Sequence, residues 1–427
     1  MSDLAIGGAG FAALFALIAL RVPIGVAMIA VGMVGYTLIA GVAPLLSFLK
    51  TETYWRFSSF DFSVIPLFLM MGNFATRAGV TTALFRAASA FIGHFRGGLA
   101  MAAIGGCAAF GTISGSSLAT AAMMGQVSLP ELRRYKYRGS FATGCLAAGG
   151  TLGALIPPSI PLIIYAIMVE GNIVQLFQAA FAPGILAAIF YVIVISIVVR
   201  LDPTAGPAAA RVDFKEKLAA LRDVWTVIVV FAVVMGGIYS GAFTPTEGAG
   251  IGAAGMALIA VFYGGMRMQG FIETMYETAL TSAMIFVILL GAGVLNAFLG
   301  FSQLPNWTAD LFQNAGLPPL LIVLGMIILY LFLGCVMDSL AMILITIPIF
   351  WPIIAALDFG LPIDDVKLWF GIITLRVVVP VSHRSGAAEP GSKSELRRPA
   401  SAGSRPPSGR ARRRGRSQSS AHPWRAN

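Results

Sequence analysis

A small set of oxygen-bearing residues stands out because the rest of the chain is so apolar. The stretch "GTISGSSLAT", residues 111–120, combines glycines, which give backbone freedom, with serine and threonine hydroxyls. The stretch "LIPPSIP", residues 155–161, places prolines inside an apolar run, where they remove backbone donors and free carbonyl oxygens. Asp338, in "GCVMDSLAM", is the only charged residue between Asp310 and Asp358. Hydroxyls, free carbonyls and a carboxylate are groups that coordinate cations.

Asp338 needs a reason to lie in an apolar segment, since a carboxylate at bilayer depth costs about 2.5–3.5 kcal/mol on insertion scales. One interpretation is that it helps to coordinate a cation or holds a helix tip by hydrogen bonds. The other is that it only caps or orients a helix and contacts no ligand. The hydroxyls at 111–120 have a similar alternative, because small residues also pack membrane helices together.

The composition indicates a membrane protein. The chain has 427 residues, of which 57% are hydrophobic and 11% charged, and its mean hydropathy is +0.84. A soluble domain is nearer half apolar and a quarter charged. Apolar runs of about 20 residues, long enough to cross about 30 Å of hydrocarbon as a helix, recur along most of the chain. The N-terminus lacks the basic segment of a signal peptide, so we expect it to be a retained membrane helix.

The net charge of +10 does not indicate a nucleic-acid partner. Residues 378–427 hold eleven Lys and Arg against two Asp and Glu, whereas residues 1–377 hold 18 against 17. The body of the chain is therefore nearly neutral, and the basic character belongs to its tail. We expect the surface of this body to contact the lipid bilayer.

The distribution of cations predicts a re-entrant hairpin over about 99–130. Cations flank this stretch on both sides, with "ELRRYKYR" directly after it, and positive charge marks the cytoplasmic ends of membrane segments. About 30 residues are too few for two full crossings. The stretch should therefore enter from the cytoplasm and return, with its tip at 111–120 buried in protein or lining a cavity. A helix over about 140–168, broken at its prolines, should follow.

The second half of the chain repeats the first at an offset of 222 residues. Pro23 corresponds to Pro245, and Ser117, in "SLA", corresponds to Ser339 in a second "SLA". The loop before the second small-residue segment, about 318–356, has no Lys or Arg, and the loop after it is acidic. This segment should therefore enter from outside. Two hairpins of opposite topology, with tips meeting near the midplane, are typical of transporters built from inverted repeats.

Five motifs in order carry a family resemblance that runs from near residue 1 to about residue 377. "PLFLMMGNF", "GTISGSSLATAAMMGQVSLPEL", "GALIPPSIPLIIYA", "FTPTEGAG" and "GCVMDSLAMILITIPIFWP" resemble the large membrane subunit of TRAP transporters, the DctM type. The resemblance implies a sodium-coupled secondary importer of an organic acid, mostly a carboxylate, with Na⁺ as coupling ion, no cofactor and no enzymatic activity. It also implies two protein partners, a small four-helix membrane subunit and a periplasmic substrate-binding protein.

The same resemblance implies an all-α polytopic membrane protein that works as an elevator-type carrier in the bacterial inner membrane, with a periplasmic N-terminus. It gives five parts. Repeat 1 consists of scaffold helices (1–70) and transport elements (71–200), which contain the first hairpin and the broken helix. Repeat 2 consists of a cytoplasmic linker and scaffold helices (201–280) and incomplete transport elements (281–377), which contain the second hairpin. A disordered basic tail (378–427) follows.

The resemblance assigns the ion and substrate sites to the hairpin tips and the helix breaks. By motif match these are Ser114, Gly115, Ser116, Ser117 and Thr120 in the first hairpin, Pro157, Pro158 and Ser159 at the first break, and Gly334 and Asp338 in the second hairpin. Na⁺ ligands are expected at the tips, with Ser116 and Asp338 as candidates. Asn73, in "MGNF", either reaches this site or bonds a neighbouring helix.

The second repeat departs from the first near its end. The copy of the first broken helix should lie near 375–391, where the chain reads "LRVVVPVSHRSGAAEPG". The composition changes abruptly at about 377–379, and a segment so rich in Arg, Ser, Pro and Gly cannot bury a core. We expect a shifted reading frame here. The alternative is an evolved tail that binds anionic lipid. With or without such a shift half of the second binding element is missing, so an inactive gene product is a further alternative.

The sequence leaves two alternatives to the importer to consider. An intramembrane serine protease would need a general base beside the serines of "ISGSS". The only histidines are His94, in a loop, and His383 and His422, in the tail, so this function is not favoured. A stand-alone ion-coupled anion carrier with the same two hairpins fits the sequence better than the protease does. It differs from the importer implied by the resemblance because it needs no binding protein.

Overall fold

The computed structural model describes residues 2–314, 318–334 and 339–386, and in these residues every regular element is a helix. The prediction of an all-α protein is therefore confirmed. Asp338 and residues 387–427, which make up most of the predicted basic tail, lie outside the described residues.

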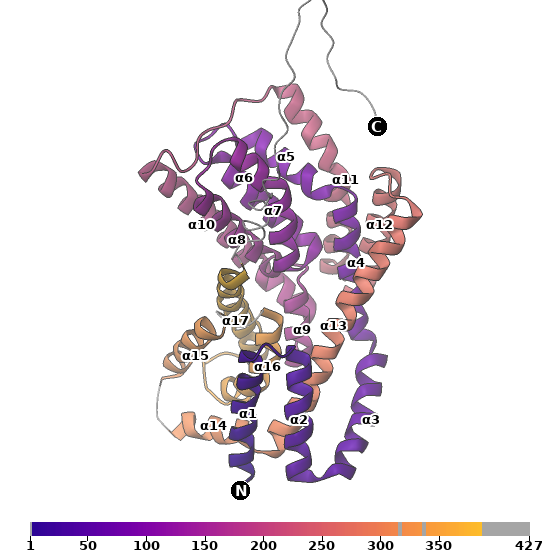
Figure 1. Cartoon of the computed structure of the whole chain (residues 1–427), viewed down its shortest axis with the longest axis vertical. Helices are drawn as coiled ribbons and strands as arrows, with labels where there is room; N and C mark the ends of the chain where they lie inside the picture. Colours follow the sequence, from indigo (N-terminus) through magenta and orange to yellow (C-terminus); the bar gives the residue numbers. More distant parts are fainter. Residues whose placement is uncertain (1, 315–317, 335–338, 387–427) are drawn as a thin grey trace, which may run out of the picture. The chain divides into compact units, whose positions relative to one another are not determined.

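The helices follow the predicted order (Figure 1). The first repeat contains α1 (Asp3–Ala19), α2 (Ile24–Ala40), α3 (Val42–Ser58), the 3-10 helix η1 (Phe60–Ser63), α4 (Val64–Arg77), α5 (Val80–Ile92), α6 (Gly98–Ser114), α7 (Ser117–Arg134), α8 (Gly139–Leu155), α9 (Ile160–Met168) and α10 (Ile173–Leu201). The second contains α11 (Phe214–Tyr239), α12 (Pro245–Phe262), α13 (Met268–Phe301), α14 (Leu304–Asn314), α15 (Pro319–Leu333), α16 (Ser339–Ala355) and α17 (Ile363–Gly386).

Length and hydropathy together identify the helices that could cross a membrane. In the described residues four helices, α10 to α13, are long and apolar enough to cross a membrane, and the number rises to six if two bent pairs each count as one span. The bent pairs are α3–α4, with an angle of 53°, and α8–α9, with an angle of 44°. Helices α6 and α16 have 17 residues each and α15 has 15, so they extend roughly 22–26 Å, short of a full crossing.

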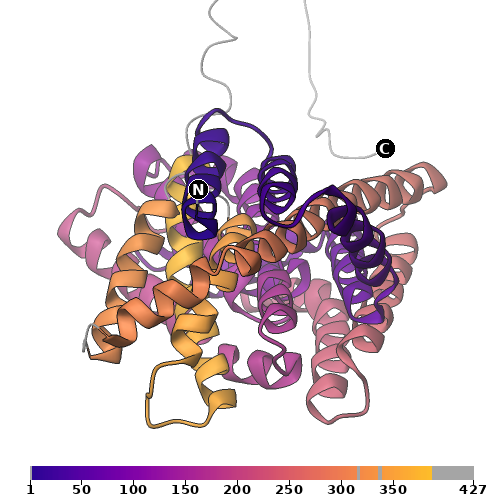
Figure 2. The same ribbon diagram turned by 90° about the horizontal axis from the view of Figure 1, so that it is seen from below.

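The two repeats use the same element order and pack on each other reciprocally. Helix α7 begins at Ser117 and α16 begins at Ser339, and Pro23 precedes α2 as Pro245 begins α12. Helix α2 packs along α13, and α4 packs along α12. Since α12 is the counterpart of α2, and α13 that of α3 and α4, the two contacts are equivalent. Figures 1 and 2 show α13 as one long helix beside α2.

Three predicted boundaries are not breaks in the structure. The boundary at residue 70 falls inside α4, and the boundary at residue 280 falls inside α13, a single helix of 34 residues. The continuous hydrogen-bond ladder of each helix leaves no hinge at these points. Helix α17 also continues to Gly386, past the predicted end of the second repeat at residue 377. Charge and hydropathy mark where a helix meets polar surroundings, not which packed unit it belongs to.

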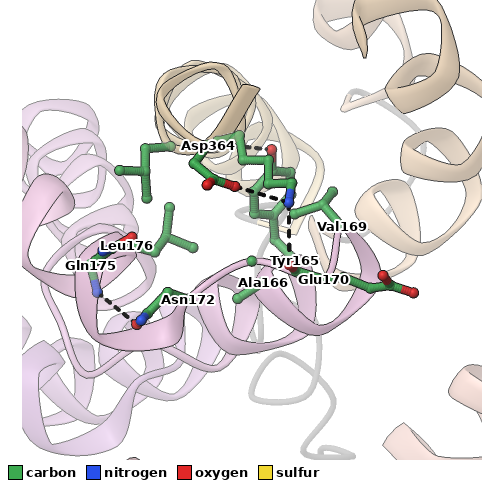
Figure 3. Close-up of a pocket in the computed structure, with 11 residues that line it drawn as sticks. Tyr165, Ala166, Val169, Glu170, Asn172, Gln175, Leu176 and Asp364 are labelled. Carbon is green, nitrogen blue, oxygen red and sulfur yellow. Dashed lines mark hydrogen bonds and ion pairs between the residues drawn. The ribbon is translucent and has the colours of Figure 1, made fainter. Parts of the chain in front are cut away.

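The broken helix of the first repeat is bonded to the second repeat through α17 (Figure 3). The Tyr165 hydroxyl, on α9, donates to the Lys367 carbonyl at 2.8 Å. The Lys367 ammonium donates to the Glu170 carbonyl at 3.4 Å and pairs with Asp364 at 3.2 Å. These groups border a polar cavity of about 260 Å³ between α9, α10 and α17. These contacts join α9 of the first repeat to α17 of the second, two helices that are far apart in the sequence.

Replacing Tyr165 with Phe should lower the free energy of unfolding by about 0.5–1.5 kcal/mol, because one net hydrogen bond is lost. Thermal or denaturant unfolding of the purified protein would measure the change. Tyr239→Phe is the matched control, since the buried Tyr239 hydroxyl has no hydrogen-bond partner among the described residues. Its removal should be neutral or stabilising. Equal losses in the two variants would show that the contact between α9 and α17 does not contribute.

Candidate functional site

The tip of the first hairpin is a two-residue turn between α6 and α7. Gly115 has φ +59°, in the left-handed region that glycine adopts without strain, and Ser116 is extended. The Ser116 hydroxyl accepts a hydrogen bond from the Ala119 N–H at 3.4 Å and so caps α7. A Cβ on Gly115 would lie 3.1 Å from the Pro158 carbonyl oxygen. The turn therefore lies directly against the break between α8 and α9.

The break is built so that its own polar groups are satisfied. Pro157 and Pro158 end the helical path, and Ser159 caps α9 by accepting from the Leu162 N–H at 3.4 Å. The Ser159 hydroxyl also donates to the Ala154 carbonyl at 2.5 Å. The Ile160 N–H donates to the Gly115 carbonyl at 3.1 Å, which joins the break to the hairpin tip by a backbone hydrogen bond.

Two hydroxyls of the predicted cluster hold the hairpin closed. The Ser114 and Thr120 oxygens lie 2.8 Å apart, and the two residues are 4% and 0% exposed. They connect the end of α6 to the first turn of α7. In this arrangement their hydroxyls bond each other, and they lie behind the tip instead of facing open space.

Glycines bring the hairpin and α8 into close contact. A Cβ on Gly153 would lie 2.8 Å from the Ser116 carbonyl oxygen and 2.9 Å from the Thr120 Cβ. A Cβ on Gly111 would lie 2.6 Å from the Gly153 Cα, so the backbones of α6 and α8 nearly touch. No other residue type fits these positions without movement of the tip.

Gly153→Ala should therefore destabilise the protein by about 1–3 kcal/mol, the usual cost of overpacking a tight interior. It should also displace the tip, because the new methyl group would meet Ser116 and Thr120. Gly144→Ala, on the same helix, is the control, since a Cβ there has no atom within 4 Å. That change should leave the unfolding temperature unchanged or raise it, because alanine favours helix. Similar unfolding temperatures for both variants would contradict the packing argument.

A cavity of about 870 Å³ lies where the described parts of the two hairpins and the helix break converge. We call it the tip cavity. Its lining comes from α7, α9, α16, α2 and α13, with Leu69 of α4. On one side it includes Gly115, Ser116, Ser117, Leu118, Ala119, Ile160, Pro161, Ser339, Leu340 and Ala341, and residues from 23–26 and 280–288 make most of the opposite side. None of the described residues that line it is charged.

Four helices begin at this cavity. The first residues of α7 (Ser117), α9 (Ile160), α16 (Ser339) and α2 (Ile24) all line it. A helix N-terminus carries unpaired N–H groups and about half a positive charge. The cavity therefore combines an uncharged apolar wall with several positive helix ends and the hydroxyls of Ser116, Ser117 and Ser339. Such a site suits an organic anion, and its oxygens can contribute to a cation.

The predicted site residues fall into three groups. Gly115, Ser116 and Ser117 line the tip cavity. A second group does not line it but supports the lining residues from behind: Ser114, Thr120, Pro157, Pro158 and Ser159. The described residues of the third group neither line the tip cavity nor belong to this support. Gly334 lies at the end of α15, the Asn73 side chain donates to Thr278 of α13 at 2.9 Å and does not line the cavity, and Asp338 lies outside the described residues.

Sequence reasoning missed the opposite wall of the cavity, made by the start of α2 and the middle of α13. These stretches are largely apolar helix. Their one hydroxyl that lines the cavity, Thr281, donates to the Glu277 carbonyl of its own helix, so little in their composition indicates a site. Ser339 was also not proposed as a site residue. The register of the repeat provides the signal that would have found it, since it corresponds to Ser117, which was.

The comparison with known families decides the family of the chain. A family profile described as the tripartite ATP-independent periplasmic transporter, DctM component, matches residues 11–380. This chain belongs to that family. The resemblance seen in the five motifs is thereby confirmed, and the chain is a multi-pass membrane protein of a family of transporter permeases.

Individual relatives agree. The chain is 39% identical to the C4-dicarboxylate TRAP transporter large permease protein DctM of Pseudomonas aeruginosa, over 72% of this chain and 71% of that protein. It is 32% identical to the sialic acid TRAP transporter large permease protein SiaM of Vibrio cholerae, over 77% and 76%. The crystal structure of the Alcanivorax borkumensis YdaH transporter, described as having an unusual topology, shares the fold with a TM-score of 0.54 at 14% identity, covering 81% of this chain and 77% of that one.

Proposed function

We propose that the chain is the permease subunit of a sodium-coupled importer that carries an organic acid across the bacterial inner membrane. It would work with a small four-helix membrane subunit and a periplasmic substrate-binding protein, and its N-terminus would be periplasmic. The observation that carries the proposal is the tip cavity, where four helix N-termini meet in an uncharged wall. Helix N-termini at broken membrane helices favour anionic groups such as carboxylates.

The oxygen atoms at the tip support the choice of sodium as the coupling ion. Ser116, Ser117 and Ser339 bring hydroxyls to the cavity. Hard cations take oxygen ligands from hydroxyls and carbonyls. The names of two relatives specify C4-dicarboxylates and sialic acid, both of which are organic acids. We extend that substrate class, and not either compound, to this chain.

The packing supports an elevator-type movement. Helices α6 to α9 are joined by close glycine contacts and by the hydrogen bond between Ile160 and Gly115. Tyr165 and Lys367 then join α9 to α17. The opposite wall belongs to α2 and α13, which pack along each other. We propose that the first group moves as one body against the second and carries the tip cavity with it.

Sodium binding is the first test. Na⁺ should raise the unfolding temperature of the purified full chain more than K⁺ at equal ionic strength, because a ligand that binds only the folded state stabilises it. Ser116→Ala and Ser339→Ala should each weaken the apparent Na⁺ affinity about tenfold, or about 1.4 kcal/mol. Ser128→Ala is the control, since that hydroxyl donates to the Met124 carbonyl of its own helix. Equal stabilisation by Na⁺ and K⁺ would contradict sodium coupling.

Transport itself is the second test. The full chain, reconstituted in liposomes with the small subunit, should accumulate an organic acid when a sodium gradient and a loaded binding protein are both present. Uptake without the binding protein would instead favour a stand-alone anion carrier. A version in which the residues after 377 are replaced by the matching segment of a relative shows whether the unusual end of the chain limits activity. Absence of uptake with both versions would contradict the proposed function.

A further inference from the structure

A second apolar cavity, of about 450 Å³, lies between α8 and α10 and shares no lining residue with the tip cavity. We call it the α8–α10 groove. Its lining residues are Ile104, Arg138, Ser140, Phe141, Gly144, Cys145, Ala148, Tyr191, Val194, Ile195 and Val198. Most of them are apolar, the charged and polar side chains of Arg138 and Ser140 lie at one end, and the Tyr191 hydroxyl lies toward the other. The proposed transport function assigns no role to this groove.

The side walls of the groove belong to a surface that meets lipid. Its floor is buried, with Ile104 and Ile195 1% and 3% exposed, whereas Val194 on its rim is 55% exposed. The neighbouring Ile193 and Ile197 of α10 are 45% and 50% exposed, and α10 is one of the helices long and apolar enough to cross a membrane. An apolar helix face exposed in this way is solvated by acyl chains, so the groove opens toward hydrocarbon.

The groove runs along the helices for about two turns. Its lining extends from Ser140 to Ala148 on α8 and from Val198 to Tyr191 on α10, which is roughly 10–12 Å along each axis. The space in front of Gly144 is open, since a Cβ there would have no atom within 4 Å. At the inner end the Tyr191 hydroxyl bonds the Thr151 hydroxyl at 3.1 Å, so that wall offers no unpaired hydroxyl. These dimensions fit part of an extended acyl chain.

The charged end of the groove holds a positioned guanidinium. Arg138 precedes α8 and pairs with Asp202, at the end of α10, at 3.0 Å. Hydrogen bonds from the hydroxyl and the backbone N–H of Thr204, together with Arg138, keep the pKa of the Asp202 carboxyl below its usual range. The ionised Asp202 pairs with Arg138 at the mouth of the groove. The guanidinium has five N–H donors, and the described residues accept from only one of its nitrogens.

The surroundings of Arg138 are basic. The segment 131–138 also contains Arg133, Arg134 and Lys136, against the single carboxylate of Glu131, and Arg200 lies in the last turn of α10. Cations near a membrane surface attract anionic lipid by about 1 kcal/mol each. The same charges place this end of the groove on the cytoplasmic side. An apolar groove with a cation at the level of the headgroups matches an anionic phospholipid better than a neutral one.

We propose that the α8–α10 groove binds one anionic phospholipid, with its phosphate at Arg138 and Ser140 and an acyl chain along Gly144, Ala148 and Tyr191. Because α8 also carries Gly153 and ends at the break beside the tip cavity, the lipid is placed on the helix that supports the transport site. The proposal needs neither sodium coupling nor a particular substrate.

Lipid titration of the delipidated full chain in detergent tests the proposal. Phosphatidylglycerol should raise the unfolding temperature saturably, with one lipid retained in native mass spectra. Phosphatidylcholine of the same acyl chains, and inorganic phosphate alone, should have little effect. Arg138→Gln should weaken phosphatidylglycerol binding about tenfold, whereas Arg133→Gln, an exposed cation of the same segment that does not line the groove, should change it less than threefold.

A second pair of variants separates the groove from the charge. Gly144→Leu should fill part of the groove and remove the retained lipid, while Gly144→Ala, whose Cβ would have no atom within 4 Å, should retain it. Both should fold, since α8 is open at this position. Equal stabilisation of the wild type, Arg138→Gln and Gly144→Leu by phosphatidylglycerol would show a diffuse surface effect and overturn the proposal. Equal binding of both phospholipids would overturn its charge selectivity, and loss of self-association with Gly144→Leu would assign the groove to a second copy of the chain.

Discussion

A helix that ends in apolar surroundings leaves backbone N–H and carbonyl groups that need hydrogen-bond partners. The rest of this structure depends on how the α6–α7 turn and the α8–α9 break supply such partners to each other. The turn between α6 and α7 offers the Gly115 carbonyl, and the break between α8 and α9 offers the Ile160 N–H, 3.1 Å away. Ser116 and Ser159 cap the helices that restart. Since these groups are paired behind the tip, the ends of α7 and α9 can face an open cavity without an unsatisfied backbone around them.

That backbone bond requires an unusually close approach, and the glycines provide it. Gly115 turns against the Pro158 carbonyl, Gly153 lies against the Ser116 carbonyl, and Gly111 lies against Gly153. The contacts link α6, α7, α8 and α9 through their backbones, which deform less than side chains. The same closeness explains why Ser114 and Thr120 bond each other, because no space for a ligand remains between them. The close backbone packing at these glycines therefore accounts both for the rigidity of the tip and for the position of the cavity in front of it.

Much of this was accessible from the sequence, because it rests on residues whose backbone behaviour is restricted. The tip predicted at 111–120 contains the turn at Gly115 and Ser116, and the prolines predicted the break before α9. The offset of 222 residues placed the start of α16 correctly. The wall from α2 and α13 was not predicted, since apolar helix looks the same whether it faces lipid, protein or a cavity. The two roles left open for Asn73 could be separated only by distance, and its bond to Thr278 is a helix contact.

Under the proposed function, the electrostatics of the tip cavity link the anion and the cation. Each helix N-terminus brings about half a positive charge, so four of them favour an organic anion and oppose a cation that enters alone. A sodium ion then needs both the tip oxygens and the negative charge of the bound acid. Reciprocity requires that the ion raise the affinity for the acid by the same factor.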